Sequence, residues 1–158
     1  MKKIILILSI FLVFIDQLLK YIVTNSLEMY QSIKVIPNFL NITYVKNTGA
    51  AFSILDGGRI FFIILALVAL VILVKYVLLD TKISRFDCIS YSLVFAGIIG
   101  NLIDRIFVGG VIDYIHFYLP FYDAPIFNFA DMCIVIGMFM VIYILVIKGD
   151  NDENIYRR

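Results

Sequence analysis

Four long hydrophobic segments alternate with more polar segments along this chain. They cover residues 4–23, 60–79, 88–107 and 126–147. About 20 residues of α-helix, each rising about 1.5 Å, cross the roughly 30 Å hydrocarbon core of a bilayer. The pattern therefore predicts an α-helical integral membrane protein with four transmembrane helices, built as a single membrane domain over residues 1–158.

The first hydrophobic segment begins as a secretory signal peptide does, with two lysines before an apolar run. No small-residue cleavage site follows, because DQLLK occupies positions 16–20 and apolar residues continue to Val23. We therefore expect a retained helix. Asp16 and Lys20 lie four residues apart on one face, where they can pair. A surface ion pair, with the lysine reaching toward water, is the structural alternative.

The second and third hydrophobic segments differ in their polar content. The second has no charge before Lys75, and we expect it to serve as scaffold. The third carries Ala96 and Gly100 in a small-xxx-small spacing, with Gly97 beside them. Small residues let another helix approach closely, so we expect tight helix packing there.

Two connecting segments, 24–59 and 108–125, predict structure outside the membrane. Residues 32–47 read SIKVIPNFLNITYVKN, a rough alternation of polar residues with β-branched or aromatic ones, which is typical of strands. We expect a small sheet on the membrane surface there. The segment 108–125 contains two adjacent glycines and two prolines, and predicts a loop.

The composition agrees with a membrane protein. The chain is 63% hydrophobic and 16% charged, whereas soluble domains average roughly 45–50% apolar and 25% charged residues. The net charge of +1 argues against a nucleic-acid partner. Cys88 and Cys133 lie in apolar runs without the spacing of a disulfide framework or a metal site, and we expect no metal and no cofactor.

The distribution of basic residues predicts the orientation. One side of the predicted membrane carries Lys2, Lys3, Lys75, Lys82, Arg85, Lys148, Arg157 and Arg158, and the other carries Lys34, Lys46 and Arg59. The positive-inside rule then places both termini in the cytoplasm. The segments 24–59 and 108–125 would be extracytoplasmic.

Polar residues gather at one depth of this predicted bundle, near its outer face. They are Asp16, Lys20, Asn101, Asp104, Arg105, Asp113, Asn128 and Asp131. Polar and charged groups are costly in apolar surroundings unless they have partners or a function. Randomly placed polar residues would not gather at one depth of the membrane, so the pattern favours a functional site.

Asp113 and Asp131 are the residues that we expect to react. Two carboxylates held together in a low-dielectric setting share one proton, because both cannot ionise at low cost. One can then take a proton from water while the other gives one to a peptide carbonyl, as in an aspartic protease. Asn101, Asp104 and Arg105 share a helix face and could orient the pair. A structural ion pair of Asp104 with Arg105 remains open at this point.

Five segments together resemble bacterial lipoprotein signal peptidases, the signal peptidase II family. They are DQLLK at 16–20, NTGAAF at 47–52, GNLIDR at 100–105, VIDY at 111–114 and FNFAD at 127–131. The resemblance covers nearly the whole chain. It implies four transmembrane helices with a small extracytoplasmic β-cradle, which residues 32–55 fit, and a short surface helix that the pattern does not locate.

The resemblance also implies an activity. Members of this family cut the signal peptide from prolipoproteins just before a cysteine that carries diacylglycerol. Asp113 and Asp131 would be the catalytic pair. Substrate-binding or supporting positions would be Asp16, Lys20, Asn47, Gly49, Asn101, Asp104, Arg105 and Asn128, with Gly100 a close-packing position. We expect a monomer in the bacterial cell membrane, with the prolipoprotein and membrane lipid as its partners and the site near the outer face.

Two other functions are compatible with parts of the pattern. Cys133 with His116 could serve a cysteine peptidase or thioltransferase, although Cys133 lies about 200° around the helix from Asp131. Asp16, Asp104 and Asp131 could instead form the relay of a small proton-coupled transporter or channel component. Against the relay, the acids are confined to one side of the predicted membrane and leave the cytoplasmic half without polar steps.

Overall fold

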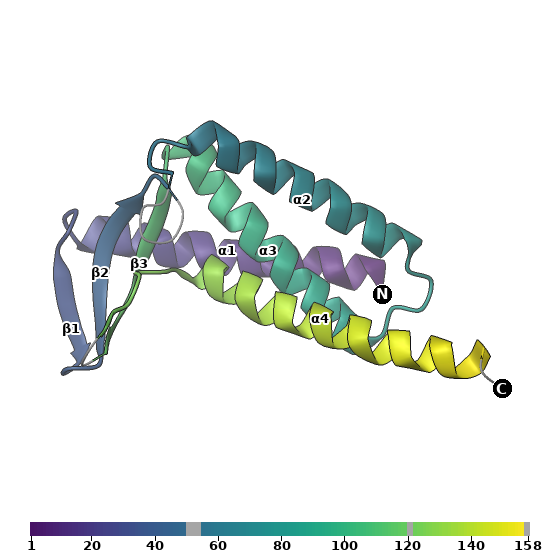
Figure 1. Cartoon of the computed structure of the whole chain (residues 1–158). Helices are drawn as coiled ribbons and strands as arrows, with labels where there is room; N and C mark the ends of the chain where they lie inside the picture. The colour runs from purple at the N-terminus through teal and green to yellow at the C-terminus, as the bar shows by residue number, and fades with distance from the viewer. Residues whose placement is uncertain (50–54, 120–121, 157–158) are drawn as a thin grey trace.

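The computed structural model of the chain describes residues 1–49, 55–119 and 122–156. The elements, in order, are α1 (Lys2–Ser26), β1 (Ser32–Ile36), β2 (Leu40–Asn47), α2 (Arg59–Leu79), α3 (Arg85–Phe107), β3 (Val111–Leu119), β4 (Tyr122–Asp123) and α4 (Phe129–Tyr156). Figure 1 shows a bundle of long helices with the sheet at one end, and the start of α1 and the end of α4 at the other.

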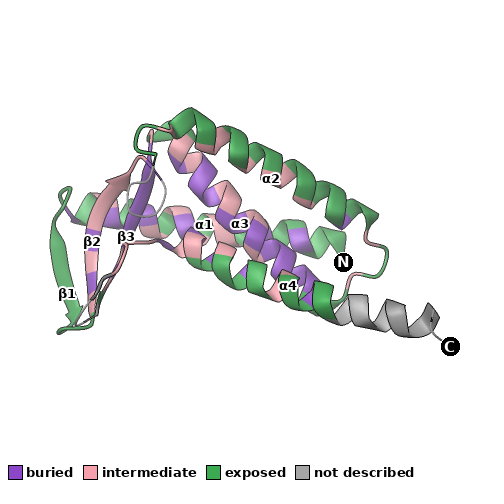
Figure 2. Cartoon of the chain, in the orientation of Figure 1, coloured by how far each residue is buried: buried purple, intermediate pink, exposed green. Residues whose placement is uncertain are grey.

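All four helices are long and apolar enough to cross a membrane. The prediction of four spans with a small sheet is therefore confirmed. Large apolar side chains are exposed along the outer faces, and α2 is exposed over most of its length (Figure 2). Such surface suits lipid, because hydrocarbon chains cover it at no hydrophobic cost.

Helix α3 is the central element, since it packs against α1, α2 and α4. Its close approach to α4 depends on Gly97, where an added Cβ would lie 2.4 Å from the Ala130 carbonyl oxygen. Its first turn is closed by a capping box in which the Ser84 hydroxyl accepts from the Asp87 N–H at 3.1 Å and the Asp87 carboxylate accepts from the Ser84 N–H at 2.7 Å.

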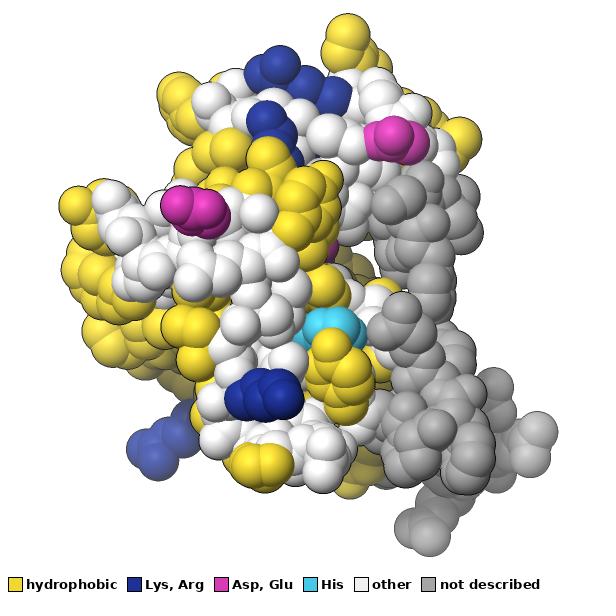
Figure 3. Space-filling view, turned by 90° about the vertical axis from the view of Figure 1, so that its left-hand side faces the viewer, with side chains coloured by type: hydrophobic (Ala, Val, Ile, Leu, Met, Phe, Trp, Pro, Cys, Tyr) yellow, Lys and Arg dark blue, Asp and Glu magenta, His cyan; other side chains and the backbone are white. Residues whose placement is uncertain are grey.

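The sheet has the strand order β1-β2-β3-β4 and its strands pair antiparallel. Figure 3 looks onto this end of the molecule, where hydrophobic side chains lie among a few charged ones. Strand β1 is exposed along its whole length, and β2 lies between β1 and β3.

Strand β3 differs from the sequence-based expectation of a loop over 108–125. The two glycines end before it, and VIDYIHFYL then alternates in the manner of a strand. Ile112 and Tyr114 pack against Val23 of α1 and against Leu27, which follows the end of that helix. Because side chains alternate along a strand, Asp113 faces the opposite side, which is the side of the candidate site.

A prediction for stability concerns the contact of α3 with α4. Gly97→Val should lower the free energy of unfolding by about 1–3 kcal/mol or more, because the new side chain meets backbone that cannot yield easily. Thermal unfolding in detergent measures this. The control Val71→Ile adds a methylene on the exposed face of α2 and should leave the midpoint unchanged; equal midpoints for Gly97→Val and wild type would contradict the prediction.

Candidate functional site

A cavity of about 430 Å³ lies where α2, α3, α4 and β3 meet near the sheet. Its polar lining consists of Asn47, Asn101, Arg105, Asp113 and Asp131. Its apolar wall includes Phe62, Leu65, Ala66 and Ala69 of α2. The sequence had assigned α2 only to scaffold, because an apolar helix gives no signal of which side lines a cavity.

The two expected reactive aspartates both border this cavity, Asp113 from β3 and Asp131 from the first turn of α4. The Asn128 amide donates to Asp113 Oδ1 at 2.7 Å, and the Asn101 amide donates to Asp131 Oδ1 at 2.7 Å. Asn128 also donates to Asn101 Oδ1 at 3.2 Å. Two linked asparagines therefore bridge the two carboxylates.

The start of α4 explains how Asp131 is oriented. Asn128 Oδ1 accepts from the Asp131 N–H at 2.9 Å, and Asp131 Oδ2 accepts from the Asn128 N–H at 3.1 Å. This reciprocal pattern is that of a capping box, with Asn128 as the N-cap. Each residue thereby satisfies a backbone donor of the first turn while its remaining polar atoms reach α3 and β3.

Asn47 supports Asp113 from the neighbouring strand. Its amide donates to Asp113 Oδ2 at 3.0 Å, and its own oxygen accepts from the Gly49 N–H at 3.0 Å. The antiparallel register of β2 with β3, which pairs Asn47 with Val111, brings the two residues together. Of the NTGAAF motif, positions 50–52 lie outside the described residues, as do positions 50–54 of the segment expected to form the cradle.

The environment of Asp113 favours its protonated form. Burial, and after it the nearby Asp131 charge, raise the pKa of this carboxyl to about 7 against the opposing effect of hydrogen bonds from Asn47 and Asn128. Loss of hydration disfavours the charged form of a carboxyl group. At neutral pH this side chain can therefore hold a proton while a second carboxylate, that of Asp131, borders the same cavity.

A buried ion cluster lies behind the cavity. Lys20 Nζ is 2.8 Å from Asp16 Oδ2 and 2.8 Å from Asp104 Oδ2, and each residue is only 1% exposed. The predicted pairing of Asp16 with Lys20 is confirmed. Lys20 does not reach toward water, however, and it is Lys20, in place of Arg105, that forms the ion pair with Asp104. Geometry explains this, because successive residues 104 and 105 point about 100° apart on a helix.

The ion cluster connects elements distant in sequence. Asp16 Oδ1 accepts from the Ala130 N–H at 3.0 Å at the start of α4, and Asp104 Oδ2 accepts from the Ile112 N–H at 3.1 Å in β3. Lys20 Nζ also donates to Asn101 Oδ1 at 3.2 Å. The cluster thus holds the elements that carry both candidate aspartates.

Gln17 was missed by sequence reasoning. Its amide donates to Asp16 Oδ2 at 3.1 Å, Asp104 Oδ1 at 3.1 Å and the Gly100 carbonyl at 3.3 Å. A Cβ at Gly100 would lie 2.5 Å from Asp16 Oδ2, so only glycine leaves room for this carboxylate. The available signal was a second polar residue beside Asp16 in an apolar helix.

Arg105 places a positive group at the cavity wall. Its guanidinium lies 5.0 Å from the ring centre of Phe62 and donates to the Asn101 carbonyl at 3.3 Å. Stacking on an aromatic face is a favourable setting for a guanidinium. From there it can offer donors to a polar group that enters the cavity.

The residues of the two other functions have different surroundings. Cys133 is buried and is not a lining residue of this cavity. The His116 ring contacts Thr43 Oγ1 at 3.3 Å and stacks on Tyr118, on the face of β3 opposite Asp113. Asp16 and Asp104 both pair with Lys20, which makes them fixed counter-ions and poor relay groups. Among residues 1–49, 55–119 and 122–156, no cluster of three His, Cys, Asp or Glu side chains forms a metal site.

Comparison with known proteins identifies one family, both by a family model and by individual relatives. The family model described as signal peptidase (SPase) II matches residues 8–147. A lipoprotein signal peptidase of Staphylococcus aureus is 40% identical over 149 residues, covering 94% of this chain and 91% of the relative. The corresponding protein of strain JH9 is 41% identical over 148 residues, with the same coverage of both.

Two solved structures share the fold. Each is described as a bacterial membrane enzyme structure obtained by the in meso method. The first, at 2.3 Å resolution, has a TM-score of 0.85 and 39% identity, covering 93% of this chain and 90% of the other. The second, at 1.9 Å resolution, has a TM-score of 0.80 and 40% identity, covering 89% of this chain and 91% of the other.

The ion cluster predicts a large effect of a single substitution. Lys20→Met should lower the free energy of unfolding by about 3–5 kcal/mol, because it leaves two buried carboxylates without their cation. Thermal unfolding in detergent provides the measurement, with Lys82→Met at an exposed loop position as the control. Adding Asp16→Asn and Asp104→Asn to Lys20→Met should recover part of the loss; a triple variant less stable than the single one would contradict the charge explanation.

Proposed function

Because the chain belongs to the signal peptidase II family of bacterial membrane proteases, we propose that it is an aspartic endopeptidase acting on diacylglyceryl-modified prolipoproteins. The family removes signal peptides from prolipoproteins, and the proposal adds the catalytic pair and the position of the cut. The observation that carries it is the pair of carboxylates, Asp113 and Asp131, bordering one cavity and bridged by two asparagines.

The proposed reaction needs one proton on the pair. Asp113, whose pKa burial raises to about 7, carries that proton and donates it to the peptide carbonyl oxygen. Asp131 takes a proton from a water molecule, whose oxygen attacks the carbonyl carbon. The C–N bond then breaks as the proton held by Asp131 passes to the leaving nitrogen, and a hydroxyl proton of the intermediate returns to Asp113 as the carbonyl re-forms. Asn101 and Asn128 keep the two carboxylates in position throughout.

The apolar surroundings of the pair support a lipid-bearing substrate. Beside Asp131, a second apolar hollow of about 430 Å³ is lined by Phe127, Met132, Val135 and Ile136. Acyl chains on the substrate cysteine can remain in such hydrocarbon surroundings while the peptide bond enters the cavity. The cut would fall on the amino side of that cysteine.

The proposed topology places the site near the outer face of the bacterial membrane. Residues of β2 and β3 line the cavity, and Figure 1 shows the sheet at one end of the bundle and the start of α1 and the end of α4 at the other. The excess of basic residues lies at the latter end. By the positive-inside rule both termini are cytoplasmic, and a signal peptide delivered from that side would end at the depth of the pair.

The catalytic pair is tested by cleavage of a purified diacylglyceryl-prolipoprotein in detergent, with mass analysis of the product. Asp113→Asn and Asp131→Asn should each lower the rate by at least about 10²–10⁴-fold, the usual contribution of one general acid or base. The double variant should be little slower, because the pair acts as a unit. Asp56→Asn, at an exposed turn, is the control. Near-normal turnover by either single variant would refute the pair.

The pH dependence follows from the raised pKa of Asp113. Activity should fall as the pH rises through about 7, because the pair then loses the proton that the reaction needs. Asn47→Ala should move this alkaline limb to higher pH, since the Asn47 hydrogen bond lowers the Asp113 pKa. Asn41→Ala, on the same strand but bonded to Ser32, should leave the limb in place. A limb that moves to lower pH in Asn47→Ala would contradict the proposal.

A further inference from the structure

A separate groove lies between α1 and α2, toward the end of the bundle away from the sheet. Its volume is about 550 Å³. Ile5, Leu6, Ile10 and Val13 line one side, and α2 contributes an apolar side that includes Val74. Both helices pack against α3, which contributes Phe95 and Ile99 to the lining of the groove.

The length of the groove matches one leaflet of a bilayer. On α1 it extends from Lys2 to Val13, and eleven residue steps of helix rise roughly 16 Å. Half of a hydrocarbon core of roughly 30 Å is about 15 Å. An acyl chain that enters at the membrane surface beside Lys2 would therefore reach about as deep as Val13.

The walls offer an occupant no polar contact below the mouth. Ser9 is the polar residue among them, and its hydroxyl donates to the Ile5 carbonyl at 2.7 Å within its own helix. Such a lining favours hydrocarbon over a polar ligand, because buried polar atoms without partners are costly.

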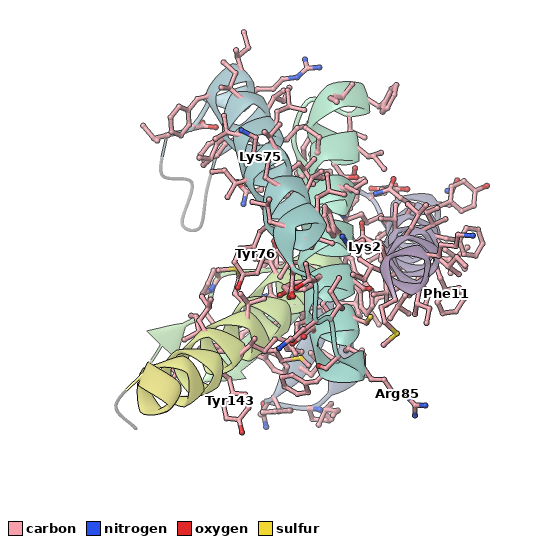
Figure 4. All side chains as sticks on the ribbon, turned by 90° about the vertical axis from the view of Figure 1, so that its right-hand side faces the viewer. Lys2, Phe11, Lys75, Tyr76, Arg85 and Tyr143 are labelled. Carbon is pink, nitrogen blue, oxygen red and sulfur yellow. The ribbon has the colours of Figure 1, made fainter. Side chains whose placement is uncertain are left out.

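The mouth of the groove is basic. Lys2 Nζ donates to the Leu78 carbonyl at 2.8 Å, which holds the ammonium between the two helices, and Figure 4 shows Lys2 at that position. Lys2 also lines an adjoining hollow of about 590 Å³ together with Lys3 and Asp80. Asp80 accepts from the Lys82 N–H at 2.9 Å and from the Tyr91 hydroxyl at 3.3 Å. The lining of this hollow thus includes two lysines and one carboxylate, and that carboxylate already accepts hydrogen bonds.

We propose that this groove binds an anionic phospholipid, with one acyl chain between α1 and α2 and the phosphate beside Lys2 and Lys3. Charge distinguishes this occupant from two others that are equally apolar. A signal peptide begins with basic residues, and a second copy of this chain would bring the same lysines, so both place like charges at the mouth. An acidic phospholipid supplies the opposite charge at the depth where the lysines lie.

The test is native mass spectrometry of the full chain in detergent with equal amounts of dioleoyl phosphatidylglycerol and dioleoyl phosphatidylcholine. The wild type should retain the anionic lipid preferentially. Lys2→Gln with Lys3→Gln should reduce that preference roughly 25-fold, since one basic residue at an anionic membrane surface is worth about fivefold. Lys34→Gln, the same change on exposed β1 at the far end, should leave it unchanged.

A second variant tests the groove without altering charge. Val74→Trp places a larger side chain in the groove from its α2 wall. It should lower the retention of both lipids while leaving the charge of the mouth unchanged. Equal retention of the two lipids by the wild type would overturn the proposal, as would an unchanged preference in the double lysine variant. Two further outcomes would assign the groove to another occupant and so overturn the proposal. One is a dimer without bound lipid, and the other is displacement of the lipid by a synthetic hydrophobic signal peptide.

Discussion

The position of one ammonium group determines how this molecule is held together at its functional end. Lys20 lies between two carboxylates inside a helix bundle, where an unpaired charge is strongly unfavourable. The charges of Lys20, Asp16 and Asp104 are therefore stable only together, and these residues come from α1 and α3. Because the two carboxylates also accept N–H groups at the start of α4 and in β3, four elements meet at one defined arrangement. The sheet and the bundle are joined here by polar contacts within an apolar interior.

The side chain of Asn101 connects this cluster to the candidate catalytic pair. Asn101 accepts from Lys20 and from Asn128 with its oxygen, and its amide donates to Asp131. Asn128 continues the network to Asp113 while it caps α4. Amides suit this role because each offers both donors and acceptors without adding charge. The carboxylates can therefore change protonation while their neighbours remain neutral, and a displacement of α1 relative to α3 would reach them through the same hydrogen bonds.

Helix α2 borders the site with apolar residues and not with polar ones. Helix α2 contacts α3 and is mostly exposed, yet it supplies an apolar wall of the cavity. Polar contacts that involve its ends include Arg59 to the carbonyl groups of Arg105 and Ile106 and Lys2 to Leu78. The pair is thus linked to α1 by buried polar contacts through Asn101, and it is bordered by apolar residues of α2 across the cavity.

Much of this organisation was readable from local sequence. Hydrophobic length predicted four helices because a bilayer sets a minimum span, and the spacing of Asp16 with Lys20 predicted their pairing because i and i+4 share a helix face. The concentration of polar residues near one depth indicated the site and its candidate aspartates. Tertiary structure alone decided that Asp104 pairs with Lys20, that residues 111–119 form a strand against α1, and that α2 lines the cavity. Those outcomes depend on which distant elements meet, since each is a contact between residues far apart in the chain, and no local periodicity encodes it.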